Sequence, residues 1–296
     1  MRSGILFGLV AMLGWGVADF YAARASRALG TVPAFFWNQV GGLALLLPFA
    51  PFIDWGARWT LANALWLALA SVALVAVYLL FYRGLRIGVV AVVSPILAAN
   101  VVITAAIGLL VFGEHLAPRE AAGVGAVIVG LLLASTDWRE IARARRGAAS
   151  GAAGGAAGGG SLGRGVPEAL GAMLLAGGVF AILVGLSRRV GWFAPIVGIR
   201  AGGLVLGGLI ALACGSLRNP GRDGFRLAIP SGALDTIAFL AFNLGVRFAP
   251  AAAIAPLGGS FPVVTILLAC IALGERPAPN QWVGAATIVV GIVLMA

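Results

Sequence analysis

The sequence has little charge and no lysine. Only 10% of its 296 residues are charged, all 20 basic residues are arginine, and 61% are hydrophobic. So few polar residues cannot cover the surface of a soluble globule, and we expect an integral membrane protein. The net charge of +10 would suggest nucleic acid in a soluble protein. Here the arginines stand in small groups between apolar runs, so we expect contact with the lipid bilayer and no nucleic-acid partner.

Cysteine and histidine are also scarce. Cys214 and Cys270 both lie in apolar runs, which excludes a disulfide framework, and His115 is the only histidine. The HExxH, GxSxG and phosphate-loop motifs are missing as well. We therefore expect no enzymatic activity, no cofactor and no metal site.

What the sequence does contain is an internal duplication. Residues 81–135 recur without a gap as residues 242–296, with 15 identities in 55 positions. Several of these identities are glycines, prolines or charged residues, which an apolar composition would not align by chance. Each copy carries an apolar run, a charged turn (GEHLAP or GERPAP) and a second apolar run.

Apolar runs of about 18 residues or more are long enough to cross a bilayer as helices. We place ten, at residues 4–28, 33–52, 63–85, 89–112, 117–135, 167–187, 195–214, 227–246, 250–273 and 278–296. This divides the chain into a first five-helix repeat (1–135), a connector (136–166) and a second five-helix repeat (167–296). In the connector, Asp137 to Arg146 is predicted to form an interfacial helix, and the Gly/Ala-rich remainder a flexible tether.

Five spans in each half place the second half in the membrane upside down. The sequence thus predicts an all-α membrane protein of ten transmembrane helices, built as two inverted five-helix repeats around a central cavity. Two such halves can expose the cavity to each side of the membrane in turn.

The doubled pattern P-x(17)-G-E-x-x-x-P-x(4)-G begins at Pro95 and again at Pro256. Together with the opening segment GWGVADF, it resembles the EamA-type transporters, the ten-helix branch of the drug/metabolite transporter superfamily. The resemblance implies a secondary active transporter that moves a small metabolite or drug-like molecule across the cytoplasmic membrane, with proton-coupled export among the options. It carries over no ligand-binding residue.

Charged side chains inside spans are costly and therefore candidates for function. Asp19 and Asp235 lie at similar depths in opposite halves, on the same side of the membrane. Two carboxylates in one low-dielectric cavity repel each other, which favours proton binding and suits a coupling site. The alternative is that each bonds to a neighbouring helix.

Arg200 is the arginine deepest in a span. Counting 1.5 Å per residue puts it roughly 8 to 10 Å from the levels of both aspartates, so we do not expect a direct salt bridge. We favour contact with lipid headgroups or capping of backbone carbonyls over binding of an anionic substrate group. Asn38, its counterpart in the first repeat, is expected to line the cavity.

Aromatic and proline residues complete the candidates. Trp15 shares a helix face with Asp19, Tyr78 is either a cavity wall or an interfacial anchor, and Asn243 lies two turns beyond Asp235. Matched prolines point to helix breaks or gates at a binding site, or to kinks for packing. The break residues are Pro95, Pro256, Gly258, Gly259 and Pro262.

Glu114 and Glu275, in the charged turns, are expected to stabilise the N-termini of the helices that follow them. A channel or facilitator without ion coupling is the alternative function. The substrate, the side that the termini face, and a monomeric or homodimeric state stay open.

Overall fold

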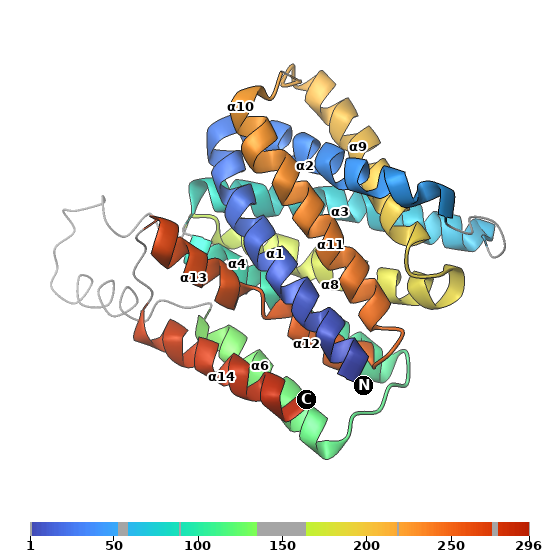
Figure 1. The fold of residues 1–296 in the computed structure, drawn as a ribbon, viewed down its shortest axis with the longest axis vertical. Helices are drawn as coiled ribbons and strands as arrows, with labels where there is room; N and C mark the ends of the chain where they lie inside the picture. The colour runs from blue at the N-terminus through green and yellow to red at the C-terminus, as the bar shows by residue number, and fades with distance from the viewer. Residues whose placement is uncertain are drawn as a thin grey trace, which may run out of the picture.

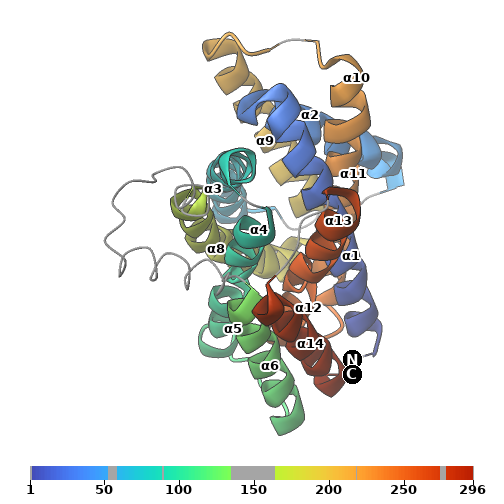
Figure 2. The same cartoon turned by 90° about the vertical axis from the view of Figure 1, so that its left-hand side faces the viewer.

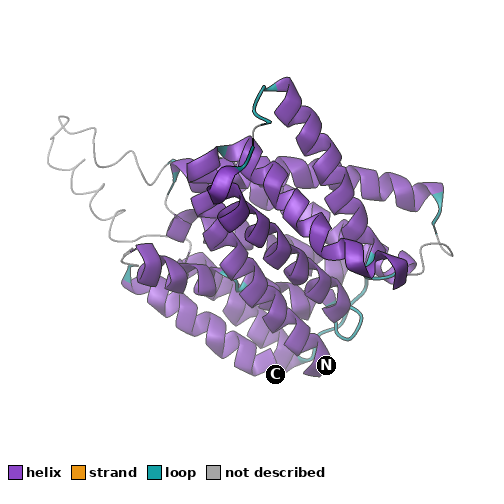
Figure 3. Cartoon of the chain, turned by 45° about the horizontal axis from the view of Figure 1, so that its top comes forward, coloured by secondary structure: helices purple, strands orange, loops and turns teal. Residues whose placement is uncertain are grey.

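The computed structural model describes residues 2–52, 59–88, 90–134, 164–217, 219–273 and 278–295. Every regular element in these ranges is helical (Figure 3). The predicted interfacial helix, the tether up to residue 163 and Glu275 lie outside them. Eight helical segments are long and apolar enough to cross a membrane. The chain is a multi-pass membrane protein.

The described residues of the first half form six α-helices and a short 3-10 helix. They are α1 (Arg2–Leu29), α2 (Thr31–Leu46), η1 (Leu47–Phe52), α3 (Leu61–Ile87), α4 (Val90–Ala98), α5 (Asn100–Leu110) and α6 (Pro118–Ala134). Thr60 caps α3, since its side chain accepts a hydrogen bond from the Asn63 amide.

The second half repeats this order. Its elements are α8 (Val166–Val190), α9 (Ala194–Ala213), α10 (Gly221–Asp223), the π-helical turn η2 (Gly224–Ala228), α11 (Ile229–Gly245), α12 (Ala251–Gly259), α13 (Pro262–Leu273) and α14 (Pro279–Met295). The last helices of the two halves, α6 and α14, have 17 residues each. These two pack side by side at one end of the molecule (Figures 1 and 2).

Two of the expected spans are broken, and they break at matching places. The run 89–112 divides at Ala99 into α4 and α5, and the run 250–273 divides at Ser260 into α12 and α13. Pro95 and Pro256 each lie inside the first of the two helices, and Pro262 starts α13. Pro95 and Pro256 each remove the hydrogen bond to the carbonyl four residues earlier, so they weaken the turn before them, and the interruptions at Ala99 and Ser260 lie one turn after them. Each of the two runs is thus divided into two helical segments, and a role of these interruptions in gating stays a prediction.

Most contacts between a helix of one half and a helix of the other have a counterpart in which the two halves are exchanged. Helix α1 packs against α11, and α8, which corresponds to α1, packs against α3, which corresponds to α11. Likewise α1 packs against α12 and α13, while α8 packs against α4 and α5. The corresponding pairs α2 with α9 and α6 with α14 pack directly on each other. This is the pattern that a twofold relation between the halves produces.

Candidate functional site

A cavity of about 70 Å³ lies between the two halves. Its walls come from α1, α3, α4 and α5 of the first half and from α8, α11 and α12 of the second. Asn100 and Phe261, which occupy matching positions just after the two helix breaks, both line it. The broken helices therefore border the cavity from opposite halves.

Both aspartates lie on the cavity wall. Asp19 on α1 is 8% exposed and Asp235 on α11 is 6% exposed. Their surroundings differ, however, because only Asp235 has a cationic partner. The two carboxylates are consequently not equivalent, although the sequence placed them at one depth.

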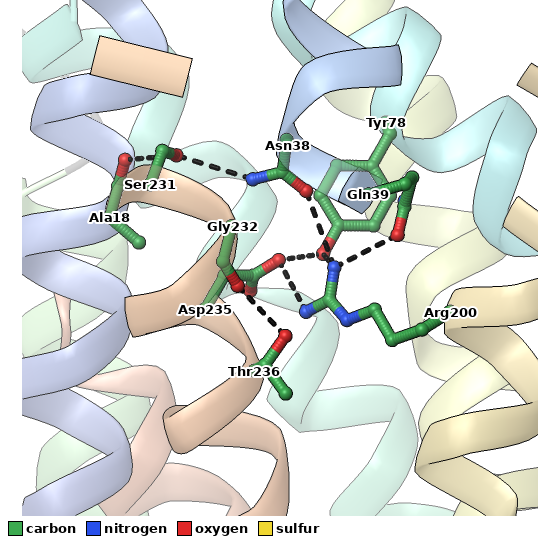
Figure 4. A network of polar contacts seen from close by, with 9 residues as sticks. All are labelled: Ala18, Asn38, Gln39, Tyr78, Arg200, Ser231, Gly232, Asp235 and Thr236. Atoms are coloured by element: carbon green, nitrogen blue, oxygen red, sulfur yellow. Dashed lines mark hydrogen bonds and ion pairs between the residues drawn. The ribbon is translucent and has the colours of Figure 1, made fainter. Parts of the chain in front are cut away.

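Asp235 forms a buried ion pair with Arg200. The Arg200 Nη2 atom donates to Asp235 Oδ2 at 2.7 Å, and the Tyr78 hydroxyl donates to the same oxygen (Figure 4). The Arg200 side chain is fully buried, so it does not extend to the headgroups. Our expectation of no salt bridge, and of headgroup contact, is wrong. The depth count compared Cα levels of upright helices and ignored the length of the arginine side chain.

The guanidinium of Arg200 also holds two amide side chains of α2. Its Nη1 atom donates to Asn38 Oδ1 at 3.3 Å and to Gln39 Oε1 at 3.1 Å. Asn38 therefore lies behind the ion pair, where it touches Arg200, and is not among the residues that line the cavity.

This network continues to the first helix. Asn38 Nδ2 donates to Ser231 Oγ at 3.3 Å, and Ser231 Oγ donates to the Ala18 carbonyl oxygen at 3.0 Å (Figure 4). Ala18 precedes Asp19, so a chain of polar contacts joins α9, α2, α11 and α1. Sequence reasoning did not single out Ser231, whose short side chain on an apolar helix carries no distinctive signal.

Asp19 has a much simpler environment. Ser94 Oγ on α4 donates to Asp19 Oδ2 at 3.1 Å. Among the described residues, no arginine lies within ion-pair distance of this carboxylate. Asp19 is thus a buried carboxylate on a cavity wall with a neutral hydrogen-bond partner.

Aromatic rings surround Trp15, one turn before Asp19. Its ring meets Phe180 and Phe239 edge to face, with centroids 5.4 and 5.3 Å away. Phe242 and Phe261 lie within 6.3 Å by the same measure. All five rings line the cavity. We call Trp15, Phe180, Phe239, Phe242 and Phe261 the aromatic cluster.

Two other candidates have separate outcomes. Tyr78 is buried and lines the cavity, so the reading as an interfacial anchor is wrong. Asn243 is fully buried one turn past Phe239, and its Nδ2 atom donates to the Phe239 carbonyl at 3.0 Å. It does not line the cavity.

The break residues lie at different distances from the cavity. Gly259 lines it, and a Cβ atom on Gly258 would come within 2.8 Å of the Trp15 ring. Glycine at position 258 is therefore required for the close approach of α12 to Trp15. Pro95, Pro256 and Pro262 shape the helices but are not among the lining residues.

Glu114 caps a helix, but not the predicted one. Its carboxylate accepts hydrogen bonds from the amides of Ala251 and Ala252, at 3.0 and 2.8 Å, at the N-terminus of α12. It also pairs with Arg188 at the end of α8. Glu120 instead accepts from the Ala117 amide beside α6, which corrects our expectation. We call Glu114, Arg188 and the first turn of α12 the inter-repeat clasp.

Comparisons with known proteins agree with this architecture. One solved crystal structure is similar over 99% of this chain and 95% of its own, with a TM-score of 0.66 and 18% sequence identity, which concerns the fold alone. No curated protein matches the sequence significantly. The sequence profile of the EamA-like transporter family matches residues 2–136 and 164–296. The chain therefore belongs to the EamA-like transporter family.

Proposed function

We propose that this protein is a secondary active transporter that carries a small molecule across the cytoplasmic membrane by alternating access. The observation that supports this most is the cavity between the halves, which is bordered by a broken helix from each. Discontinuous helices in matching places of two repeats are typical of transporter binding sites. Members of this family are transporters and not enzymes.

The proposed topology has ten spans in two inverted repeats. Five crossings in each half turn the second half over, and the exchanged helix contacts fit a twofold axis in the membrane plane. Such an axis makes inward-open and outward-open arrangements near-equivalent in energy, because each half can adopt the conformation of the other.

In this proposal the structure represents a closed arrangement. A cavity of about 70 Å³ is far smaller than the roughly 300 Å³ or more of typical small-molecule sites. A substrate can enter only if the halves separate on one side. The inter-repeat clasp joins the turn between α5 and α6 to the start of α12 and the end of α8. This contact must therefore break when the cavity opens to the side of the membrane on which the clasp lies.

We propose Asp19 as the site of coupling, with protons as the coupling ion. The charge of Asp235 is neutralised by Arg200, whereas Asp19 has no cation beside it. Asp235 on α11 and Tyr82 on α3 are titratable groups that interact electrostatically with Asp19. The ion pair then serves to position Tyr78 and to keep α9, α2 and α11 together.

Counterflow tests the carrier proposal. A thermal-shift screen of purified protein against amino acids, sugars, nucleosides and amines identifies a ligand, which is then used in radiolabelled form. In proteoliposomes preloaded with unlabelled ligand, we expect transient uphill accumulation of label and saturable flux. A channel or facilitator pore without alternating access would give linear flux and no accumulation, and that result would contradict the proposal.

A further inference from the structure

We propose that the cavity binds an organic cation with an aromatic or aliphatic body, whose charged group contacts the Asp19 carboxylate. This inference rests on the proposed function, because it names the substrate class of the same cavity. It is carried by the charge of the cavity wall and by the aromatic cluster.

The cavity wall carries acidic side chains without basic ones. Its described lining residues include two carboxylates and no arginine or histidine. Arg200, which is not among the lining residues, pairs with Asp235 and neutralises it. The carboxyl group that remains for a ligand is that of Asp19, with Ser94 as its neutral partner.

A buried carboxylate without a cation is energetically costly. The carboxylate avoids this cost either by binding a proton, as proposed above, or when a positively charged ligand takes the place of that proton. An anionic ligand would raise the energetic cost of the buried carboxylate further. The attraction between the Asp19 carboxylate and a cationic ligand thus both holds the ligand and selects cations over anions.

The aromatic cluster provides the second part of the site. Trp15 lies one helical turn from Asp19 on α1, so the indole and the carboxylate face the same region. Aromatic faces attract cations, most strongly in tryptophan, and this attraction grows when water is excluded. Phe180 and Phe239, which stack with centroids 5.5 Å apart, offer further apolar surface for the body of the ligand.

The two neutral amide and hydroxyl side chains of the wall other than Tyr78 each donate one hydrogen bond to the backbone of their own segment. Asn100 Nδ2 donates to the Leu97 carbonyl at 2.8 Å, and Thr104 Oγ1 donates to the Asn100 carbonyl at 3.3 Å. A sugar would therefore find few free partners for its hydroxyl groups. A zwitterionic amino acid would place its carboxylate near Asp19 and Asp235, with Arg200 already bound.

The probe for this inference is benzyltrimethylammonium, whose charge does not depend on pH. Its binding to the purified full-length protein is measured by calorimetry, beside the neutral isostere neopentylbenzene and the anion benzenesulfonate. We expect the cation to bind at least tenfold more tightly than either. Equal binding of the neutral isostere would overturn the inference, because the charge would then contribute nothing.

Variants of Asp19 test the contact itself. Asp19→Asn should weaken cation binding at least tenfold, whereas Asp19→Glu should retain most of it. Glu168→Gln is the matched control, because Glu168 pairs with Arg83 on the surface away from the cavity, and it should bind as the wild type does. Wild-type affinity in Asp19→Asn would overturn the inference.

A second variant covers the case in which Asp19→Asn does not fold. Phe180→Leu keeps the charge and removes an aromatic ring, so it should weaken the cation several-fold more than the neutral isostere. An equal effect on both would contradict the inference. If counterflow occurs with another ligand class while the cation does not bind, this inference fails and the transporter proposal stands. If the cation binds at Asp19 without counterflow, the transporter proposal fails and this inference stands.

Discussion

Replacing Arg200 with methionine should destabilise the protein by about 3 to 5 kcal/mol. Methionine matches much of the arginine stem but leaves the buried carboxylate of Asp235 without its cation. It also removes the donor that holds Asn38 and Gln39. The measurement is reversible thermal or denaturant unfolding of the purified protein in one detergent.

The double variant Arg200→Met/Asp235→Asn is the control for this prediction. It removes both charges, so no uncompensated ion remains and much of the lost stability should return. If Arg200→Met alone unfolds as the wild type does, or if the two substitutions are simply additive, the ion pair does not stabilise the fold as we describe.

Gly232→Ala should be the second severe substitution. A Cβ atom at position 232 would lie 1.8 Å from the Asn38 carbonyl oxygen, and backbone cannot yield as a flexible side chain can. The substitution must push α11 away from α2 and thereby separate Asn38 from Ser231. We expect a loss of about 3 kcal/mol or more, measured by the same unfolding experiment.

Gly178→Ala is the matched control on α8. A Cβ atom there meets nothing within 4 Å, and alanine is favoured over glycine in a helix by up to about 1 kcal/mol. Its stability should equal or exceed that of the wild type. If Gly232→Ala is as stable as Gly178→Ala, the tight contact between α2 and α11 is not a feature of the folded protein.

The duplication made the large features predictable. Identical prolines at matching positions predicted two helix breaks, and the structure has them at Ala99 and Ser260. Apolar runs predicted the spanning helices because the bilayer sets their length. Both kinds of inference depend on local sequence and on the internal repeat, which are available without knowledge of packing.

The ion pair was not predictable from depth alone. Arg200 and Asp235 lie on α9 and α11, and their meeting depends on how these helices approach each other and on the reach of the arginine side chain. The scarcity of charged residues in the spans would have been a better guide, because a fully buried arginine requires an acceptor. Asp235 was one of the few carboxylates in a span.

Glu114 shows the same limit in another way. The turn before α6 offered a nearby helix N-terminus, and local reasoning chose it. In the folded chain the N-terminus of α12, from the opposite repeat, comes within hydrogen-bonding distance. Glu120, two residues into α6, takes the local position instead. Sequence patterns find a helix-capping residue but cannot choose between a local and a distant helix.

The most direct test of alternating access is the accessibility of the cavity from each side of the membrane. Ala176 on α8 is buried and lines the cavity, so Ala176→Cys, with Cys214 and Cys270 replaced by serine, places a thiol there. Oriented vesicles are then treated with a membrane-impermeant maleimide on one side or the other. The account predicts labelling from both sides, with blocking from one side preventing labelling from the other. Labelling from a single side only, or from neither, would contradict it.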